Sequence, residues 1–149
     1  MSQLVEDDKK MTQVMIDKVF SFGELGFQEF ETSKYLGKIL EENGFDVEYQ
    51  ISGIPTSWLA TWSNGEGGPT IALGSDFDGV PSTSQYPGVA YEKPVVEGAP
   101  GHGEGHNIGL PIVVTSALSL KKIMIENNIP GTLLIWPGVA EEILGSKAW

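Results

Sequence analysis

The stretch PTIAL at residues 69–73 and the stretch TLLIW at residues 132–136 decide the fold. Both are apolar at successive positions, which is typical of a central strand covered on both faces. Residues 111–127, between them, are rich in Ile, Val, Ala and Leu and read as a largely buried helix. Strand, helix, strand is a crossover unit, so the pattern predicts that the two strands pair in parallel within an α/β sheet.

The chain before these strands predicts two helices followed by two short strands. Apolar residues at helical spacing mark residues 7–22 and 28–43, and extended runs mark 46–51 and 57–62. Segment 79–111 differs, with five prolines, seven glycines and little periodicity. A loop of this length within a domain is usually either functional or disordered.

Length and composition exclude several classes of protein. The 149 residues suit one domain or a fraction of a larger one, and 40% hydrophobic residues allow a real core. We find no apolar stretch long enough to span a bilayer, so no membrane partner is expected. The start of the chain is polar and acidic, unlike a signal peptide, which favours a cytoplasmic location.

Charge and cysteine content narrow the possible partners and chemistry. Twenty acidic residues against nine basic ones give a net charge of -11, which repels phosphate backbones and argues against nucleic-acid binding. The chain has no cysteine, which excludes disulfides, thiolate metal sites and a cysteine nucleophile.

Three clusters of polar residues stand where the predicted strands end or the predicted helix begins, which is where ligand sites collect in open α/β sheets. The first contains Asp76 and Asp78, which could ligate a cation or orient a ligating histidine. Its alternative is an Asx-turn that leaves a strand.

The second cluster holds both histidines of the chain, His102 and His106, with Glu104 between them and a glycine beside each. Neutral imidazole and carboxylate suit Zn²⁺ or Mn²⁺. The alternatives are a glycine-rich turn in which Asn107 caps the helix, or an anion site at the helix start, although Glu104 speaks against an anion.

The third cluster is Glu141-Glu142, after the strand at 132–136. Adjacent carboxylates point in different directions, so one can bind metal while the other handles protons. The alternative is an acidic start to a short helix. The three clusters together favour a metal centre.

At this point the residues resemble a known family, the metallopeptidase-related amidohydrolases that include aminoacylases, indole-acetyl-amino-acid hydrolases and p-aminobenzoyl-glutamate hydrolase. The likeness runs in order through ELGFQE at 24–29, DFDGVP at 76–81, HGEGHN at 102–107 and AEE at 140–142. No single motif is decisive, but the ordered set is specific and spans nearly the whole chain.

The resemblance implies roles for the residues at matching positions. A divalent metal, Zn or Mn, would be ligated by Glu104, His106 and Glu142. Glu104 stands where the family usually has a ligating Cys. Glu141 would be the general base that deprotonates a metal-bound water for attack on the amide of an N-acyl amino acid or small peptide-like substrate, and would return the proton to the leaving amine. Asp76, Asp78 and His102 would flank the ligands.

The resemblance also implies that the chain is incomplete. Residues 1–149 would form the amino-terminal portion of a three-layer α/β/α zinc-peptidase-like catalytic domain, with mostly parallel central strands. The lid and dimerisation domain, the rest of the catalytic domain and two more ligating histidines would lie outside it. We therefore expect this chain alone to be inactive, with an exposed sheet edge and face that would fit a homo-oligomer or the missing remainder of the enzyme. The alternatives are a non-catalytic binding or assembly module, a split subunit that retains the fold, or a plain acidic α/β domain without a site.

Overall fold

Three long helices and four strands make up the part of the chain that the structure, a computed structural model, describes. This part is residues 2–145, with side chains from residue 6 onward. The elements, in chain order, are α1 (Ser2–Phe22), α2 (Phe30–Glu42), β1 (Asp46–Tyr49), the short 3₁₀ helix Ile51–Gly53, β2 (Trp58–Asn64), β3 (Thr70–Asp76), α3 (His106–Glu126), β4 (Gly131–Gly138) and a second 3₁₀ helix, Glu141–Ile143. The sequence therefore predicted every long helix and every strand of this part, with small errors at their ends.

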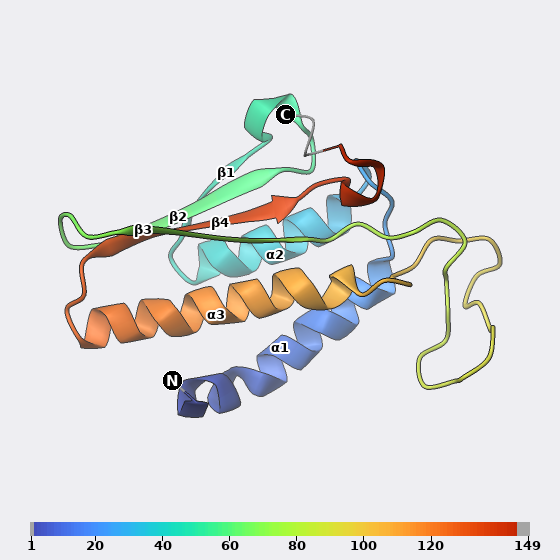
Figure 1. Ribbon diagram of the computed structural model, residues 1–149, viewed down its shortest axis with the longest axis horizontal. Coiled ribbons are helices and arrows are strands. Elements are labelled where there is room, and N and C mark those ends of the chain that lie inside the picture. Colours follow the sequence, from blue (N-terminus) through green and yellow to red (C-terminus); the bar gives the residue numbers. More distant parts are fainter. Residues whose placement is uncertain (1, 146–149) are drawn as a thin grey trace.

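The four strands form one sheet in the order β1-β2-β4-β3, seen in Figure 1. The two apolar strands β3 and β4 pair in parallel, and α3 crosses between them, as predicted. β2 pairs antiparallel with both β1 and β4, so the sheet is mixed. The expectation of mostly parallel strands therefore holds for β3 and β4 but not for the sheet as a whole.

All three helices lie on one side of the sheet. α2 contacts β1 and β2, α3 contacts β3 and β4, and α1 packs mainly on α3 (Figure 1). The core forms between these layers, from alternate strand residues and the inward helix faces. Its fully buried members include Leu36, Leu40, Trp58, Ala60, Leu110, Val114, Ala117, Leu133 and Ile135.

The opposite face of the sheet is not covered by any described residue. Strand side chains on that face are exposed or half-buried, and Trp136 is 45% exposed. The Trp136 ring lies over Gly74 on the neighbouring strand, where a Cβ would collide with it. The predicted uncovered face is therefore present, and it displays apolar surface.

α3 corrects one sequence expectation. By length and composition α3 is apolar enough to cross a membrane. The expectation that the sequence holds no apolar stretch long enough to span a bilayer was therefore wrong. Its buried residues Leu110, Val114 and Leu118 instead pack in the core between the sheet and α1. Polar contacts also tie it to α1, where Lys122 lies 3.0 Å from Asp8. A helix in the core of a soluble protein can have the same length and apolar composition as a membrane span. α3 packs in the core in the way such a helix does.

Candidate metal centre

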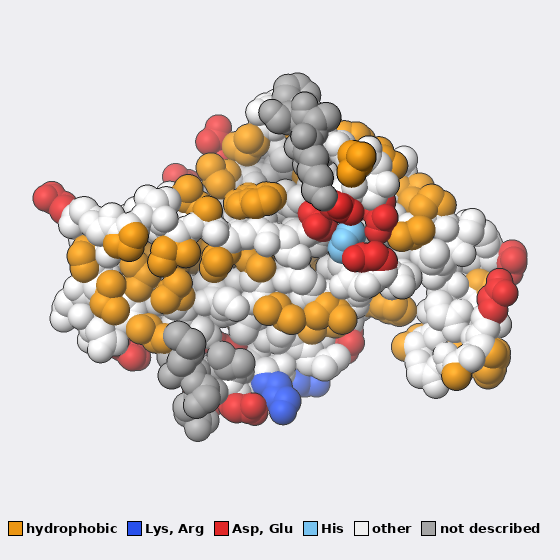
Figure 2. Space-filling model, in the orientation of Figure 1, with side chains coloured by type: hydrophobic (Ala, Val, Ile, Leu, Met, Phe, Trp, Pro, Cys, Tyr) orange, Lys and Arg blue, Asp and Glu red, His pale blue; other side chains and the backbone are white. Residues whose placement is uncertain are grey.

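The three predicted clusters meet at one end of the sheet. Asp76 is the last residue of β3, His106 is the first residue of α3, and Glu141 and Glu142 follow the end of β4. Parallel strands end at the same edge, so the crossover that defines the fold also brings these segments together. Figure 2 shows acidic side chains surrounding a single histidine at this place.

His106 lies at the centre of the cluster and is held by the backbone of the loop that leaves β3. Its Nδ1 lies 3.0 Å from the carbonyl oxygen of Asp78. In the neutral imidazole, an Nδ1–H that donates to this carbonyl leaves Nε2 with a free lone pair. A backbone partner of this kind fixes the tautomer and the ring orientation of metal-ligating histidines. His106 is therefore set up to offer Nε2 to a cation.

Four carboxylates approach the imidazole of His106. On the Nε2 side, Glu104 lies 3.0 Å and Asp76 4.0 Å away, whereas Asp78 Oδ1 and Glu142 lie 3.4 Å and 3.8 Å from Nδ1. Two donor atoms bound to one tetrahedral zinc at about 2.0–2.1 Å lie about 3.3 Å apart. The spacing between Nε2 and Glu104 is therefore already close to metal-binding geometry, and Asp76 would reach it with a small movement.

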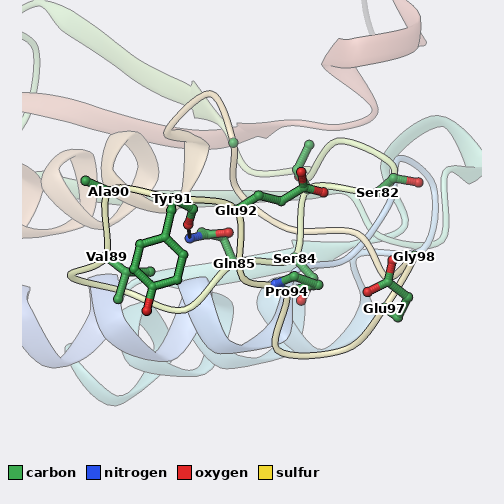
Figure 3. Close-up of a pocket in the computed structure, with 12 residues that line it drawn as sticks. Ser82, Ser84, Gln85, Val89, Ala90, Tyr91, Glu92, Pro94, Glu97 and Gly98 are labelled. Atoms are coloured by element: carbon green, nitrogen blue, oxygen red, sulfur yellow. Dashed lines mark hydrogen bonds between the residues drawn. The ribbon is translucent and has the colours of Figure 1, made fainter.

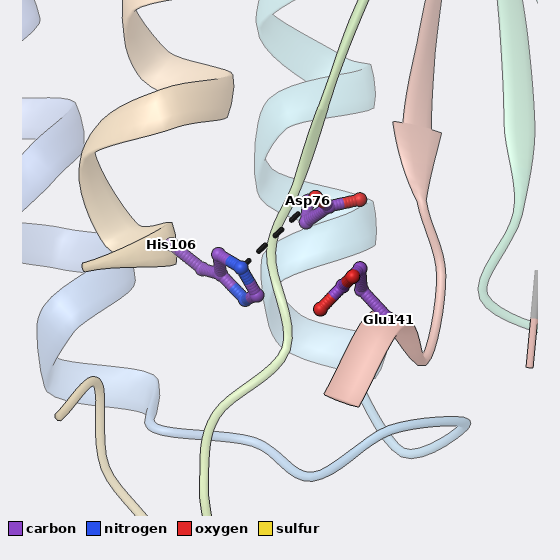
Figure 4. A group of neighbouring side chains, drawn as sticks. All are labelled: Asp76, His106 and Glu141. Atoms are coloured by element: carbon purple, nitrogen blue, oxygen red, sulfur yellow. Dashed lines mark ion pairs between the residues drawn. The ribbon is translucent and has the colours of Figure 1, made fainter. Parts of the chain in front are cut away.

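The donor atoms form two overlapping triads that share His106. Glu104, His106 and Glu142 make the first, and Asp76, His106 and Glu141 make the second; within each triad the ligand atoms lie within 4.8 Å of one another. The first is the ligand set predicted from the sequence. Figure 4 shows the second, in which the Asp76 and Glu141 side chains face the imidazole from two different strand ends.

The electrostatics of the cluster fit a cation. Partial burial raises the pKa of Glu142 above its ordinary value; His106 opposes this shift, and the like charges of Asp78, Glu104 and Glu141 add to it. Asp78 is buried, and its Oδ1 has no hydrogen-bond partner. One imidazole carries at most one positive charge, so it cannot neutralise these carboxylates. A divalent cation would offset two of these negative charges, and imidazole with carboxylates is a donor set that Zn²⁺ and Mn²⁺ accept.

Close packing between β3 and β4 fixes two members of the cluster. Glu142 donates its backbone N–H to Asp78 Oδ2 at 3.1 Å, which joins the exit loops of the two strands. Asp76 lies across Gly138, where a Cβ would collide with its carboxylate. These contacts hold the Asp76 and Asp78 carboxylates against the backbone at and after the end of β4.

His102 lies close enough to the cluster for the charges of His106 and Asp78 to act on its pKa, but its Nε2 contacts α1. Its ring is buried and its Nε2 lies 3.1 Å from the carbonyl oxygen of Val19, near the end of α1. Burial lowers the pKa of His102, which favours the neutral ring with Nε2–H as donor. In this structure its contact is with α1. Nor does Asn107 cap α3, because the N-cap position belongs to Gly105.

Sequence reasoning assigned no role to two residues of the stretch ELGFQE that support the site. The Glu24 carboxylate accepts hydrogen bonds from the first-turn amides of α2, and its carbonyl accepts the amide of Gly79, next to Asp78. The fully buried Glu29 accepts the amide of Ala140, next to Glu141. The sequence shows only that this stretch resembles a family motif, because the sequence pattern does not show which charged side chains become buried.

The long loop between β3 and α3 is ordered by its own hydrogen bonds. Val80 and Gly101 pair at its neck, and Thr83 donates its hydroxyl to both of their carbonyls. A hollow of about 610 Å³ lies within the loop, lined by polar and exposed residues that include Tyr91 and Glu97 (Figure 3). It borders the metal centre only at Gly103, so none of the cluster's side chains lines it.

Comparison with known proteins agrees with the resemblance predicted from the sequence. The chain is 30% identical over 138 residues to a subunit of the p-aminobenzoyl-glutamate hydrolase of Escherichia coli (strain K12). That match covers 93% of this chain but only 28% of the relative, so the chain spans less than a third of the relative's length. No family model matches the chain.

Solved structures share the fold. A TM-score of 0.75 relates 93% of the chain to 35% of an aminohydrolase from methicillin-resistant Staphylococcus aureus, at 20% identity. A TM-score of 0.69 relates 95% of it to 40% of the YXEP protein of Bacillus subtilis, a dinuclear metal-binding peptidase of the M20 family, at 23% identity. The α/β fold class is therefore confirmed, and the chain spans less than half the length of these two structures.

Proposed function

We propose that this chain, which resembles the metallopeptidase-related amidohydrolases in sequence and fold, carries part of a hydrolytic metal centre. The observation that supports the proposal is the convergence of Glu104, His106 and Glu142 at the ends of the parallel strands, with Glu141 beside them. We take the substrate to be the amide bond of an N-acyl amino acid or small peptide-like molecule, since the named relative acts on such a bond.

The residues divide into ligands and a proton carrier. Glu104, His106 and Glu142 would hold a divalent cation, Zn or Mn, which supplies Lewis-acid activation of water and of the amide carbonyl. Glu141 would accept the proton of the attacking water and pass it to the leaving amine. Asp78 would steady this arrangement, because it contacts both the ring of His106 and the amide of Glu142.

The donor count limits what this part of the protein can do. A catalytic zinc needs about three protein ligands and an open position, and a two-metal centre needs more. Glu104, His106 and Glu142 satisfy the first requirement but not the second. We therefore propose that residues 1–149 act as the amino-terminal portion of a catalytic domain and that turnover needs residues supplied from outside them.

Metal content and turnover test the proposal separately. Protein purified without chelator should carry close to one Zn or Mn per chain by elemental analysis, and His106→Gln should lose it. Amide hydrolysis, followed as release of p-aminobenzoate from p-aminobenzoyl-glutamate, should be absent from the chain alone and appear in a longer protein that contains it. The metal centre would be refuted if the unsubstituted chain carries no metal and binds neither Zn nor Mn when they are added.

The uncovered sheet face favours a second function, that of an assembly module. The face carries Trp136 and the half-buried Leu134, and the outer edge of β3 has no described neighbour. Such surfaces pair with another chain or aggregate. The assembly function would be favoured over the metal-dependent hydrolase if the purified chain sediments as a defined dimer and binds no metal. It would also require that neither the chain nor a longer protein containing it hydrolyses the amide substrate.

A further inference from the structure

Glu29 is a buried carboxylate that lies outside the metal cluster but contacts the turn that carries it. Its side chain is fully buried at the start of α2. One oxygen accepts the Ala140 amide at 2.8 Å, and the other accepts the Thr56 hydroxyl at 2.7 Å. Both oxygens are thus committed to partners far away in the sequence, which is how a buried charge-bearing group is tolerated.

The turn that Glu29 holds is unusual. Ala140 adopts φ 52° and ψ 45°, the left-handed region that side chains other than glycine rarely occupy. Conformations of this kind persist only where the surroundings over-determine them. Here Glu29 fixes the Ala140 amide, while the Ala140 carbonyl accepts the amide of Gly145 at 2.8 Å.

The consequence of this turn is the direction of the two carboxylates that follow it. The chain reverses at Ala140 so that the Glu142 amide reaches Asp78 Oδ2, and Asp78 in turn contacts His106. Gly26, in the same stretch as Glu29, packs against Ala140 so closely that a Cβ would lie 2.9 Å from the Ala140 methyl group. The stretch 24–29 therefore supports the turn from behind.

We propose that Glu29 is a positioning residue for the metal centre, acting through the Ala140 amide to aim Glu141 and Glu142 at His106. This inference rests on the proposed metal-binding function for its consequence, but the contact between Glu29 and Ala140 can be tested without any metal. Glu29 touches none of the ligands, so its effect passes through the backbone.

Three substitutions separate positioning from general structural support. Glu29→Gln keeps an oxygen that accepts the Ala140 amide, and its NH₂ group can donate to the Thr56 hydroxyl, so it should preserve the geometry. Glu29→Asp keeps the buried carboxylate but is one methylene shorter, so it cannot satisfy both partners. Glu29→Ala removes the acceptor. If either Glu29→Asp or Glu29→Ala fails to fold, the other takes its place.

Amide hydrogen exchange in chelator is the first measurement. In Glu29→Asp and Glu29→Ala the amides of Ala140 and Glu142 should exchange at least tenfold faster than in the parent, while core amides such as those of Val114 and Ile135 stay protected. Glu29→Gln should match the parent. Equal protection of Ala140 in all four proteins would overturn the proposal, as would equal loss at Ala140 and in the core.

Titration with Zn²⁺ and with Mn²⁺ is the second measurement. Loss of residues that directly orient metal ligands typically weakens metal binding about 10–100-fold. Glu29 acts one step further away, through the backbone, so we expect the lower end of that range, about tenfold, for Glu29→Asp and near-parental affinity for Glu29→Gln. Parental affinity in Glu29→Asp would overturn the proposal. If the parent itself binds neither metal, the proposed function fails, and the exchange data still decide whether Glu29 positions the turn.

Discussion

Replacing Glu142 by Gln should stabilise the metal-free chain and abolish its stabilisation by metal. The raised pKa of Glu142 means that its ionised form is unfavourable among its neighbours. Its backbone amide, which bonds to Asp78, is retained in the variant, so the change removes charge and leaves the turn in place.

Two opposite shifts in melting temperature follow. Removing a partly desolvated charge that also faces like charges is worth about 0.5–1 kcal/mol at a partly solvated site. A chain of this size gains about 2–4 °C per kcal/mol, so Glu142→Gln should melt about 1–4 °C above the parent in chelator. With metal at about 100 times its dissociation constant, the parent should gain about 2.7 kcal/mol, or about 5–10 °C. The variant should gain little.

Thermal unfolding in chelator and in excess Zn²⁺ or Mn²⁺ measures both shifts. Glu66→Gln, on the exposed turn between β2 and β3, is the matched control, because it removes one negative charge far from the cluster. If Glu142→Gln melts below the parent in chelator, or gains as much from metal as the parent does, then the account of the cluster is wrong.

Three further predictions concern single positions. Gly138→Ala should lower stability by about 1–3 kcal/mol and weaken metal binding, because the new methyl group collides with the Asp76 carboxylate. An unchanged free energy of unfolding, measured by chemical denaturation, would contradict this. Burial raises the pKa of Glu29 above its ordinary value of 4.5, so the free energy of unfolding should fall as pH rises from about 4.5 through the folded-state pKa. Glu29→Gln should flatten that slope in urea unfolding series, and equal slopes would refute the assignment. Gly74→Leu should displace the Trp136 ring and shift its fluorescence to longer wavelength, whereas an unchanged spectrum would mean that the ring does not lie on Gly74.

The sequence predicts the elements well because periodicity records burial. Apolar runs give β3 and β4, and helical spacing gives α2. The antiparallel pairings of β2 are harder, since a half-buried strand such as WLATWSN carries no record of its neighbour's direction. The first helix begins at Ser2 and not near residue 7, and Asp8, close to its start, contacts Lys122 of α3. That tertiary contact is invisible to a local pattern.

For the candidate site too, some features could be predicted from the sequence and others could not. Glu104, His106 and Glu142 lie together, as do Asp76 and Glu141, and the ends of parallel strands make that proximity predictable. Their roles stay predictions. The contact of His102 with α1 could not be predicted, because the spacing of residues in a glycine-rich turn does not show which distant helix will pack against it.

The position of β4 between β2 and β3 has a consequence for the order of folding. β2 and β3 are joined by a short turn, yet each pairs with β4 and not with the other. Thr70 pairs with Thr132, so the sheet cannot close during synthesis until the chain has grown past both β3 and the whole of α3. Pairing across such long separations is slow. The last of these strands to leave the ribosome thus completes the sheet and brings Glu141 and Glu142 to His106, so the cluster can assemble only when folding of this part is nearly complete.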